Sequence, residues 1–81
     1  MDEIIKIVVN NNKVNTCDPI AFVNRIIKDV SKNTDISYRN RKVLIDLGFA
    51  EEYLYSDRGG YKMFYIRLTS KGNEYLKQIS Q

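Results

Sequence analysis

The feature that most constrains the fold is the order of local signals between Asp35 and Leu76. A basic helix pattern comes first, Leu-Gly-Phe follows at 47–49, and two strand patterns then flank the glycine pair at 59–60. The run Leu-Thr-Ser-Lys-Gly at 68–72 is typical of a helix start. A glycine after the last apolar turn favours a helix end, and glycines between strand patterns favour a hairpin. The order predicts a basic helix and a basic hairpin loop lying side by side.

A helix is predicted at residues 19–31, ahead of the basic helix. Asp18 can cap its first free amides, and Pro19 at the first helical position loses no hydrogen bond there. Apolar residues at three- and four-residue intervals then form one stripe, which comprises Ile20, Val23, Ile27 and Val30, widened by Phe22 and Ile26. The polar run at 31–35 predicts a turn before the next helix.

The basic helix is predicted at residues 36–47, with Asp35 or Ser37 as its cap. At 100° per residue, its inward side comprises Ile36, Asn40, Val43, Leu44 and Leu47. Its outward side comprises Tyr38, Arg41, Lys42 and Ile45, with Arg39 at a flank. An exposed Ile45 is unexpected, and two interpretations stay open: it contacts a second subunit, or it lies at the edge of the core.

The N-terminal stretch has the most ambiguous pattern of the chain. Its β-branched residues suit either a strand or a broad helical stripe, and the acidic Asp2 and Glu3 favour a helix start. A helix is therefore predicted at residues 2–10. Residues 13–16 are predicted to form a very short strand against the hairpin, and Cys17 is predicted to be a small buried residue.

A β-hairpin is predicted at residues 51–68, because the second half of this segment alternates between two faces. The positions expected to face the helices are Phe64, Ile66 and Leu68. A helix at 70–79 follows, with Thr69 as its cap and Gly72 allowing close approach of a neighbouring backbone. Two of its side chains are expected to return to the core, Leu76 and Ile79.

The composition is typical of one small domain, and it predicts no metal, cofactor or catalytic site. A chain of 81 residues with 43% hydrophobic and 28% charged residues is expected to fold as a single globular unit with a small core. One cysteine and no histidine cannot supply an internal disulfide or a common zinc ligand set. Neither Ser37 nor Ser56 has an identifiable base, and no glycine-rich phosphate loop follows a strand. An enzyme is not expected.

Charge is distributed unevenly along the chain. The net charge of +3 is weak evidence for a polyanionic partner, but the stretch from Arg25 to Lys42 holds six basic and two acidic residues, so the rest is about neutral. The apolar run at 4–9 is too short to span a bilayer and follows acidic residues, whereas a signal peptide would begin with basic ones. A cytoplasmic location without membrane association is expected.

At this point the chain resembles the winged helix-turn-helix domains of small bacterial, phage and archaeal regulators, including the MarR-like and PadR-like groups. The resemblance covers roughly residues 19–79. It is carried by Leu44-Ile-Asp-Leu47-Gly48-Phe49, by Arg58-Gly59-Gly60, by the aromatic strand, and by the run from Leu68 to Leu76. It implies an α+β fold with a three-helix core, a two- or three-stranded β-wing and a C-terminal helix. The long helical extension with which MarR-like proteins dimerise has no counterpart here.

The resemblance assigns residues 36–47 to a recognition helix, 19–31 to its supporting helix and 56–62 to the wing. The residues expected to contact double-stranded DNA are then Ser37, Tyr38, Arg39, Arg41 and Lys42 on the helix, with Arg58 and Lys62 on the wing. A charged helix face alone is more often simply solvated, and hairpin tips are polar by default. Their position in a helix-turn-helix followed by a wing is what favours DNA contact.

Three functions follow as hypotheses. The first is a small homodimeric transcriptional regulator, a repressor, that binds duplex DNA, with Ile45 at the dimer interface. The second is a centromere-binding adaptor of plasmid or phage segregation, similar to the TubR-like proteins, which coats repeated sites and recruits a filament-forming motor. The third is a protein-interaction module that does not bind DNA and presents its basic face to an acidic protein.

Overall fold

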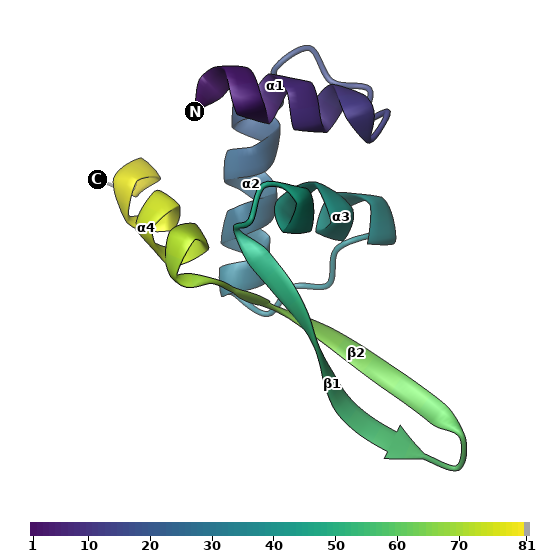
Figure 1. The fold of residues 1–81 in the computed structure, drawn as a ribbon. Coiled ribbons are helices and arrows are strands. Elements are labelled where there is room, and N and C mark those ends of the chain that lie inside the picture. The colour runs from purple at the N-terminus through teal and green to yellow at the C-terminus, as the bar shows by residue number, and fades with distance from the viewer. Residues whose placement is uncertain (81) are drawn as a thin grey trace.

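The computed structural model describes the backbone of residues 1–80 and the side chains of residues 1–53, 59–60 and 65–80. Its elements are α1 (Asp2–Asn11), α2 (Pro19–Ser31), α3 (Tyr38–Asp46), β1 (Ala50–Arg58), β2 (Tyr61–Leu68) and α4 (Ser70–Ile79). The fold is α+β, as the sequence predicts, with three helices followed by a two-stranded antiparallel hairpin and a C-terminal helix. Figure 1 shows the hairpin projecting away from the helices, on the side of the molecule opposite α1. No helix among the described residues has the length and apolarity needed to cross a membrane.

Three helices begin at side-chain caps. The Asp18 carboxylate accepts a hydrogen bond from the Ala21 amide at the start of α2, and the Thr69 hydroxyl accepts one from the Gly72 amide at the start of α4. At α3 the cap is Ser37, whose Oγ accepts a hydrogen bond from the Asn40 amide. Because Ser37 has extended backbone angles, α3 begins at Tyr38 and not at the predicted residue 36.

The ends of the first three helices share one geometry. A residue with positive φ follows each helix: Lys13 after α1, Asn33 after α2 and Gly48 after α3. The next amide then bonds back across the last turn, as from Phe49 N to Leu44 O at 2.9 Å, while Gly48 N bonds to Ile45 O at 2.9 Å. This Schellman pattern satisfies helix-end carbonyls, and glycine adopts the required φ of 78° without strain. The Leu-Gly-Phe signal therefore ends α3 as predicted.

The α1 ending overturns the strand predicted at residues 13–16. The Val14 amide donates to Val9 O at 3.3 Å, which completes the helix end and leaves that amide unavailable for strand pairing. Val14 packs partly buried against the core, and the sheet contains only β1 and β2. Cys17, predicted to be buried, is exposed because the connection to α2 runs over the surface.

The core is formed where the helices meet the base of the hairpin. Its fully buried side chains include Ile5, Val9, Val23, Ile26, Ile27, Val43, Leu44 and Phe49. The Phe49 ring stacks on Tyr75 with a centroid distance of 4.6 Å, and the Tyr75 hydroxyl bonds to Asn24 Oδ1 at 2.6 Å. Burial raises the pKa of Tyr75, and the negative charge of Asp2 raises it further. Tyr75 thus connects α4 to α2 and to Phe49, the residue just before β1.

Close backbone packing fixes α4 against the start of β1. A Cβ atom at Gly72 would collide with the Phe49 carbonyl oxygen, so only glycine fits there, as the sequence predicts. Thr69 adds two bonds at the same place: its hydroxyl donates to Gly48 O at 2.6 Å, and its amide donates to Phe49 O at 3.0 Å. Thr69, which follows β2, is therefore hydrogen-bonded to both residues that precede β1.

The hairpin pairs Ala50 with Leu68 at its base and Arg58 with Tyr61 at its tip, with one irregularity in the register between Leu54 and Ser56. Partly buried Ile66 and Leu68 pack against the core. The side chain of Phe64, predicted on the same face, lies outside the described residues. Leu76 and Ile79 of α4 also pack partly buried on the core, as expected.

Candidate nucleic-acid interface

The N-terminal half of α3 is more exposed than its C-terminal half. Tyr38 is 75% exposed, and both Ser37 and Arg39 are exposed beside it. The Lys42 side chain is 52% exposed one turn further along. The capping bond of Ser37 uses its oxygen as acceptor, so its hydroxyl proton can be donated to a ligand. These four residues offer two cations and two hydroxyl groups on one helix end, and we call them the α3 surface.

A small polar network holds Lys42. Its Nζ lies 3.3 Å from Asp46 Oδ2, and Asn12 Nδ2, from the end of α1, bonds to the same oxygen at 3.1 Å. The hydrogen bond from Asn12 lowers the pKa of the Asp46 carboxyl group, and Lys42 lowers it further, against a smaller opposing effect of burial. Asp46 therefore pairs with Lys42 as a carboxylate anion.

A shallow hollow of about 270 Å³ lies between α3 and β1. It is lined by Tyr38, Lys42, Ile45, Asp46 and Glu52. Ile45 is half-buried, lies outside the core cluster and lines this hollow, so both interpretations of this residue remain predictions. The carboxylates of Asp46 and Glu52 make this part of the surface unfavourable for a polyanion. An anionic ligand would meet less repulsion at the N-terminal end of α3 than at this hollow.

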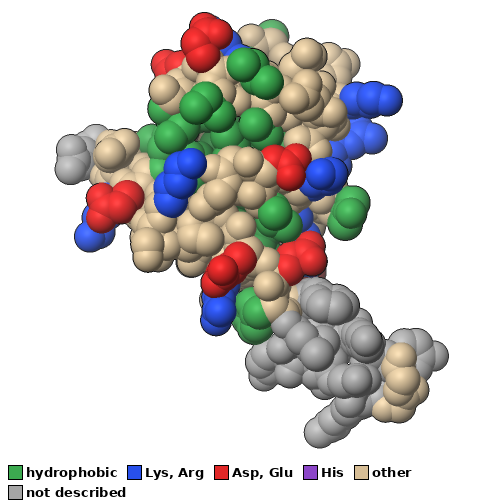
Figure 2. Space-filling view, viewed as in Figure 1, with side chains coloured by type: hydrophobic (Ala, Val, Ile, Leu, Met, Phe, Trp, Pro, Cys, Tyr) green, Lys and Arg blue, Asp and Glu red, His purple; other side chains and the backbone are tan. Residues whose placement is uncertain are grey.

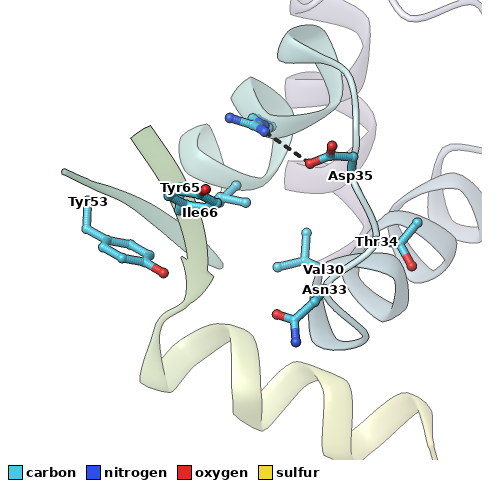
Figure 3. Close-up of a pocket in the computed structure, with 8 residues that line it drawn as sticks. Val30, Asn33, Thr34, Asp35, Tyr53, Tyr65 and Ile66 are labelled. Atoms are coloured by element: carbon cyan, nitrogen blue, oxygen red, sulfur yellow. Dashed lines mark ion pairs between the residues drawn. The ribbon is translucent and has the colours of Figure 1, made fainter. Parts of the chain in front are cut away.

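Arg41 does not share this surface, in contrast to the sequence-based expectation. Only 24% of its side chain is exposed, and its Nη2 lies 3.7 Å from the carboxylate of Asp35, which is fully exposed. Its Nε is buried and makes no hydrogen bond within the described part of the chain. Figure 3 shows the ion pair with Asp35, dashed, above the cleft that the turn between α2 and α3 forms with the hairpin.

This cleft has a volume of about 350 Å³ and combines apolar and polar walls. Its lining residues are Val30, Asn33, Thr34, Asp35, Arg41, Tyr53, Tyr65 and Ile66. Residues 41 and 42 point about 100° apart on a helix. Lys42 is exposed, whereas Arg41 lines the cleft that Ile66 of the hairpin also lines. Helix periodicity alone cannot show which flank the hairpin covers.

The hairpin provides the second part of the candidate interface. Gly59 and Gly60 form its exposed tip between the two strands. The side chains of Arg58 and Lys62, predicted to contact DNA, lie outside the described residues. Near the base of the hairpin, Arg67 Nε bonds to Glu51 Oε1 at 2.8 Å, and its guanidinium lies 5.0 Å from the centroid of the Tyr53 ring.

Figure 2 shows Lys and Arg side chains along the right-hand side of the helical body, above the projecting hairpin. α3 and β1 are in direct contact, whereas the tip of the hairpin projects away from the helices (Figure 1). Sequence reasoning did not identify Asn12, Asp46 or Glu52 as part of this surface. The spacing of Lys42 and Asp46, one turn apart, was an available signal for their pairing. The contributions of Asn12 and Glu52 depend on elements brought together by folding.

The described residues contain no group of three or more histidine, cysteine, aspartate or glutamate side chains placed to hold a metal ion. The order of helices, hairpin and C-terminal helix is a winged-helix-like α+β topology. Comparison with protein-family models, with curated proteins and with solved structures gives no match for this chain.

Proposed function

We propose that the protein binds double-stranded DNA through the α3 surface and the hairpin, as a small dimeric transcriptional regulator that acts as a repressor. The N-terminal end of α3 would enter the major groove, and the hairpin would contact the backbone or the minor groove alongside. The observation that carries the proposal is the exposed cationic start of α3, presented next to a projecting β-hairpin.

The distribution of charge on α3 supports a defined orientation on DNA. Arg39 and Lys42 can neutralise phosphates or donate to guanine, and Ser37 and Tyr38 can donate hydrogen bonds to phosphate oxygens. Asp46 lies one turn beyond Lys42, where a negative charge would repel a phosphate. The helix would therefore enter the groove by its N-terminal end and not lie along the groove over its full length.

Arg41 has a different part in this proposal. Its guanidinium lies between the turn of the helix-turn-helix and the hairpin, and only a small fraction of the side chain reaches solvent. We assign it to positioning the α2–α3 turn relative to the hairpin, and not to base contact.

The proposal is tested by selecting bound fragments from genomic DNA and then measuring affinity for a selected duplex by fluorescence anisotropy. The wild-type protein should bind, with log affinity falling by about 0.9 per log unit of salt for each phosphate contacted. The double variant Arg39→Glu with Lys42→Glu should reduce affinity by at least about 100-fold, because it reverses two charges at the contact.

A matched control reverses two exposed lysines outside the candidate interface, Lys28→Glu on α2 together with Lys77→Glu on α4. This control changes the net charge equally and should retain most of the affinity. Equal losses in both double variants would show that net charge alone attracts DNA, and the α3 site would be rejected.

The number and spacing of the selected sites separate the alternatives. One or two sites near a promoter fit a repressor, whereas a tandem array bound cooperatively fits a segregation adaptor that recruits a filament-forming motor. Absence of duplex binding even at low salt would instead favour the protein-interaction module.

A further inference from the structure

The Arg41 guanidinium has unused hydrogen-bonding capacity in the cleft between the α2–α3 turn and the hairpin. Its Nε is buried and makes no hydrogen bond within the described part of the chain. Its Nη2 lies 3.7 Å from Asp35 Oδ1, which is longer than a hydrogen bond between nitrogen and oxygen. Buried donors are nearly always paired in native proteins. These donors are therefore available to an acceptor that enters the cleft.

Asp35 supplies the opposite charge at the same place. Its side chain is fully exposed, so its carboxylate oxygens can accept hydrogen bonds from a ligand. Of the described residues that line the cleft, Asp35 and Arg41 are the charged ones. A simple anion drawn to Arg41 would be repelled by Asp35, and a simple cation would meet the reverse. A ligand that carries both charges side by side would satisfy both residues.

The remaining walls of the cleft are largely apolar. Val30 is 7% exposed and belongs to the core, and Ile66 packs against the same core. Figure 3 shows Val30 on one side of the cleft, with Ile66 and Tyr65 of the hairpin across from it. The volume of about 350 Å³ is near the lower end of the range for small-molecule pockets, roughly 300 to 1,000 Å³. The cleft therefore suits a small ligand with an apolar group.

We propose that this cleft binds a free α-amino acid with an apolar side chain. Such a molecule carries its carboxylate and its ammonium on one carbon atom, next to the apolar group. Arg41 would hold the carboxylate, Asp35 would accept hydrogen bonds from the ammonium, and the ligand side chain would lie against Val30 and Ile66. The four charges would then alternate in sign, which makes every neighbouring pair attractive.

The guanidinium suits this part because it is planar and can donate two parallel hydrogen bonds to one carboxylate. The exposed part of the Arg41 side chain lets a carboxylate reach the Nη groups from the cleft, and a small shift of the side chain would bring Nε to the second oxygen. The Asn33 amide and the Thr34 hydroxyl line the same cleft and can donate further hydrogen bonds to the ligand.

The open, small cleft predicts modest affinity. An amino acid has few atoms to bury, so we expect a dissociation constant of roughly 0.1 to 1 mM for L-phenylalanine and L-leucine. Titration of nitrogen-labelled protein, full chain and without DNA, followed by two-dimensional NMR, measures this affinity. The amide signals of residues 33–35 and the Nε–H signal of Arg41 should shift together and saturate. Absence of saturable shifts up to about 10 mM (roughly ten times the weakest expected dissociation constant) would overturn the proposal.

Ligand analogues test the two charges separately. N-acetyl-L-phenylalanine lacks the ammonium and phenethylamine lacks the carboxylate, so each should bind at least about 10-fold more weakly than L-phenylalanine. An N-acetyl derivative that binds as tightly as the amino acid would mean a site for simple anions and reject the proposal.

Glycine tests the apolar wall, because it carries both charges and no side chain. It should bind at least about 10-fold more weakly than L-leucine, since it leaves the apolar surface of Val30 and Ile66 uncovered. Equal affinities for glycine and L-leucine would contradict the predicted position of the side chain.

The variant Asp35→Asn tests the ammonium contact with little risk to folding, because the side chain is fully exposed. It should reduce the affinity for L-phenylalanine by at least about 5-fold and remove the preference over the N-acetyl derivative. Glu3→Gln is the matched control: it removes an exposed carboxylate from α1, on the side of the molecule away from the hairpin, and should bind like the wild type (Figure 1). An unchanged preference in Asp35→Asn would reject the role of Asp35.

The variant Arg41→Lys keeps the positive charge and loses the planar pair of donors. It should bind L-phenylalanine at least about 10-fold more weakly, with thermal unfolding used to check that the fold is retained. Unchanged affinity in the folded variant would overturn the assignment of Arg41. If this variant does not fold, the preference measured with Asp35→Asn decides.

The outcomes distinguish this inference from the proposed function. Saturable binding of L-phenylalanine with no duplex binding would reject DNA binding and leave the cleft site standing, and duplex binding without amino-acid binding would do the reverse. If both hold, saturating L-phenylalanine should leave the salt dependence of duplex binding unchanged, because Arg41 is not a phosphate contact. A slope reduced by about 1 would show that Arg41 contacts phosphate and would reject its assignment to the cleft.

Discussion

Lys42 and Asp46 pair across one turn of α3, with 3.3 Å between Nζ and the carboxylate. The pair marks the boundary between a cationic helix start and an acidic helix end, and Asn12, the C-cap residue of α1, donates a hydrogen bond to the carboxylate. The same aspartate therefore orients Lys42 and limits the surface that a polyanion can approach.

Replacing Asp46 by Asn should strengthen binding to a selected duplex by about 2- to 5-fold, since an exposed ion pair and its charge are worth about 0.2 to 1 kcal/mol. The Lys42 ammonium is then freed for phosphate, and a repelling charge is removed. Anisotropy titrations at two salt concentrations measure this effect. Weaker binding would show that the orientation of Lys42 matters more than the negative charge.

The basic residues of α3 should differ in their effect on salt dependence. Arg39→Met and Lys42→Met should each reduce the slope of log affinity against log salt by about 1, as expected when one phosphate contact is lost. Arg41→Met should leave the slope nearly unchanged, because Arg41 faces the cleft and is mostly covered. Equal slopes for Arg41→Met and Lys42→Met would show that Arg41 leaves the cleft to contact DNA.

Gly72→Ala should destabilise the fold by on the order of 3 kcal/mol, at the upper end of the usual cost of overpacking, because its Cβ would collide with a backbone carbonyl that cannot move freely. Urea unfolding monitored by circular dichroism measures the loss. Asn73→Ala is the matched control at the next position, which is exposed on the same helix, and it should be neutral or slightly stabilising. A small effect at Gly72 would mean that α4 can shift away from Phe49.

Tyr75→Phe should reduce the free energy of unfolding by about 1 kcal/mol, because the stacking on Phe49 is kept while the hydrogen bond to Asn24 is lost. A loss well above that value would indicate that the hydroxyl has a further partner. Asn24→Ala should cause a comparable loss, and the double variant should show that the two effects are not additive.

Alkaline pH should destabilise the wild-type protein through Tyr75. In the unfolded chain this phenol ionises near its ordinary pKa of 10.0, and in the folded state its pKa is higher. The neutral phenol is therefore favoured by folding, so its contribution is complete below about pH 10 and declines as pH rises above that value. Thermal unfolding between pH 8 and pH 11 (a range of roughly one to two units around the ordinary value) should show this decline, and Tyr75→Phe should show less of it.

The local sequence determined where most elements begin and end. Asp18-Pro19 starts α2, Thr69 caps α4, and Gly48 ends α3, because caps and positive-φ positions act over only a few residues. The same short range explains the exposure of Ser37, Tyr38, Arg39 and Lys42, which follows from helix periodicity once the apolar side is fixed.

Only the tertiary structure decided which flank of α3 is covered. The hairpin and the α2–α3 turn enclose Arg41, whereas Lys42, the next residue, stays on the open side next to Asn12 and Glu52. Asn12, which bonds to Asp46, lies 34 residues away in the sequence. Tyr65 and Ile66, which line the cleft with Arg41, lie on β2. Sequence spacing within α3 carries no information about these neighbours. In the same way, the pattern of residues 2–10 allowed a broad apolar stripe, but packing determined that Ile5 and Val9 are buried and that Ile4 and Ile7 remain exposed. The sequence of α1 is apolar on more than one side, and tertiary packing determines which side is buried.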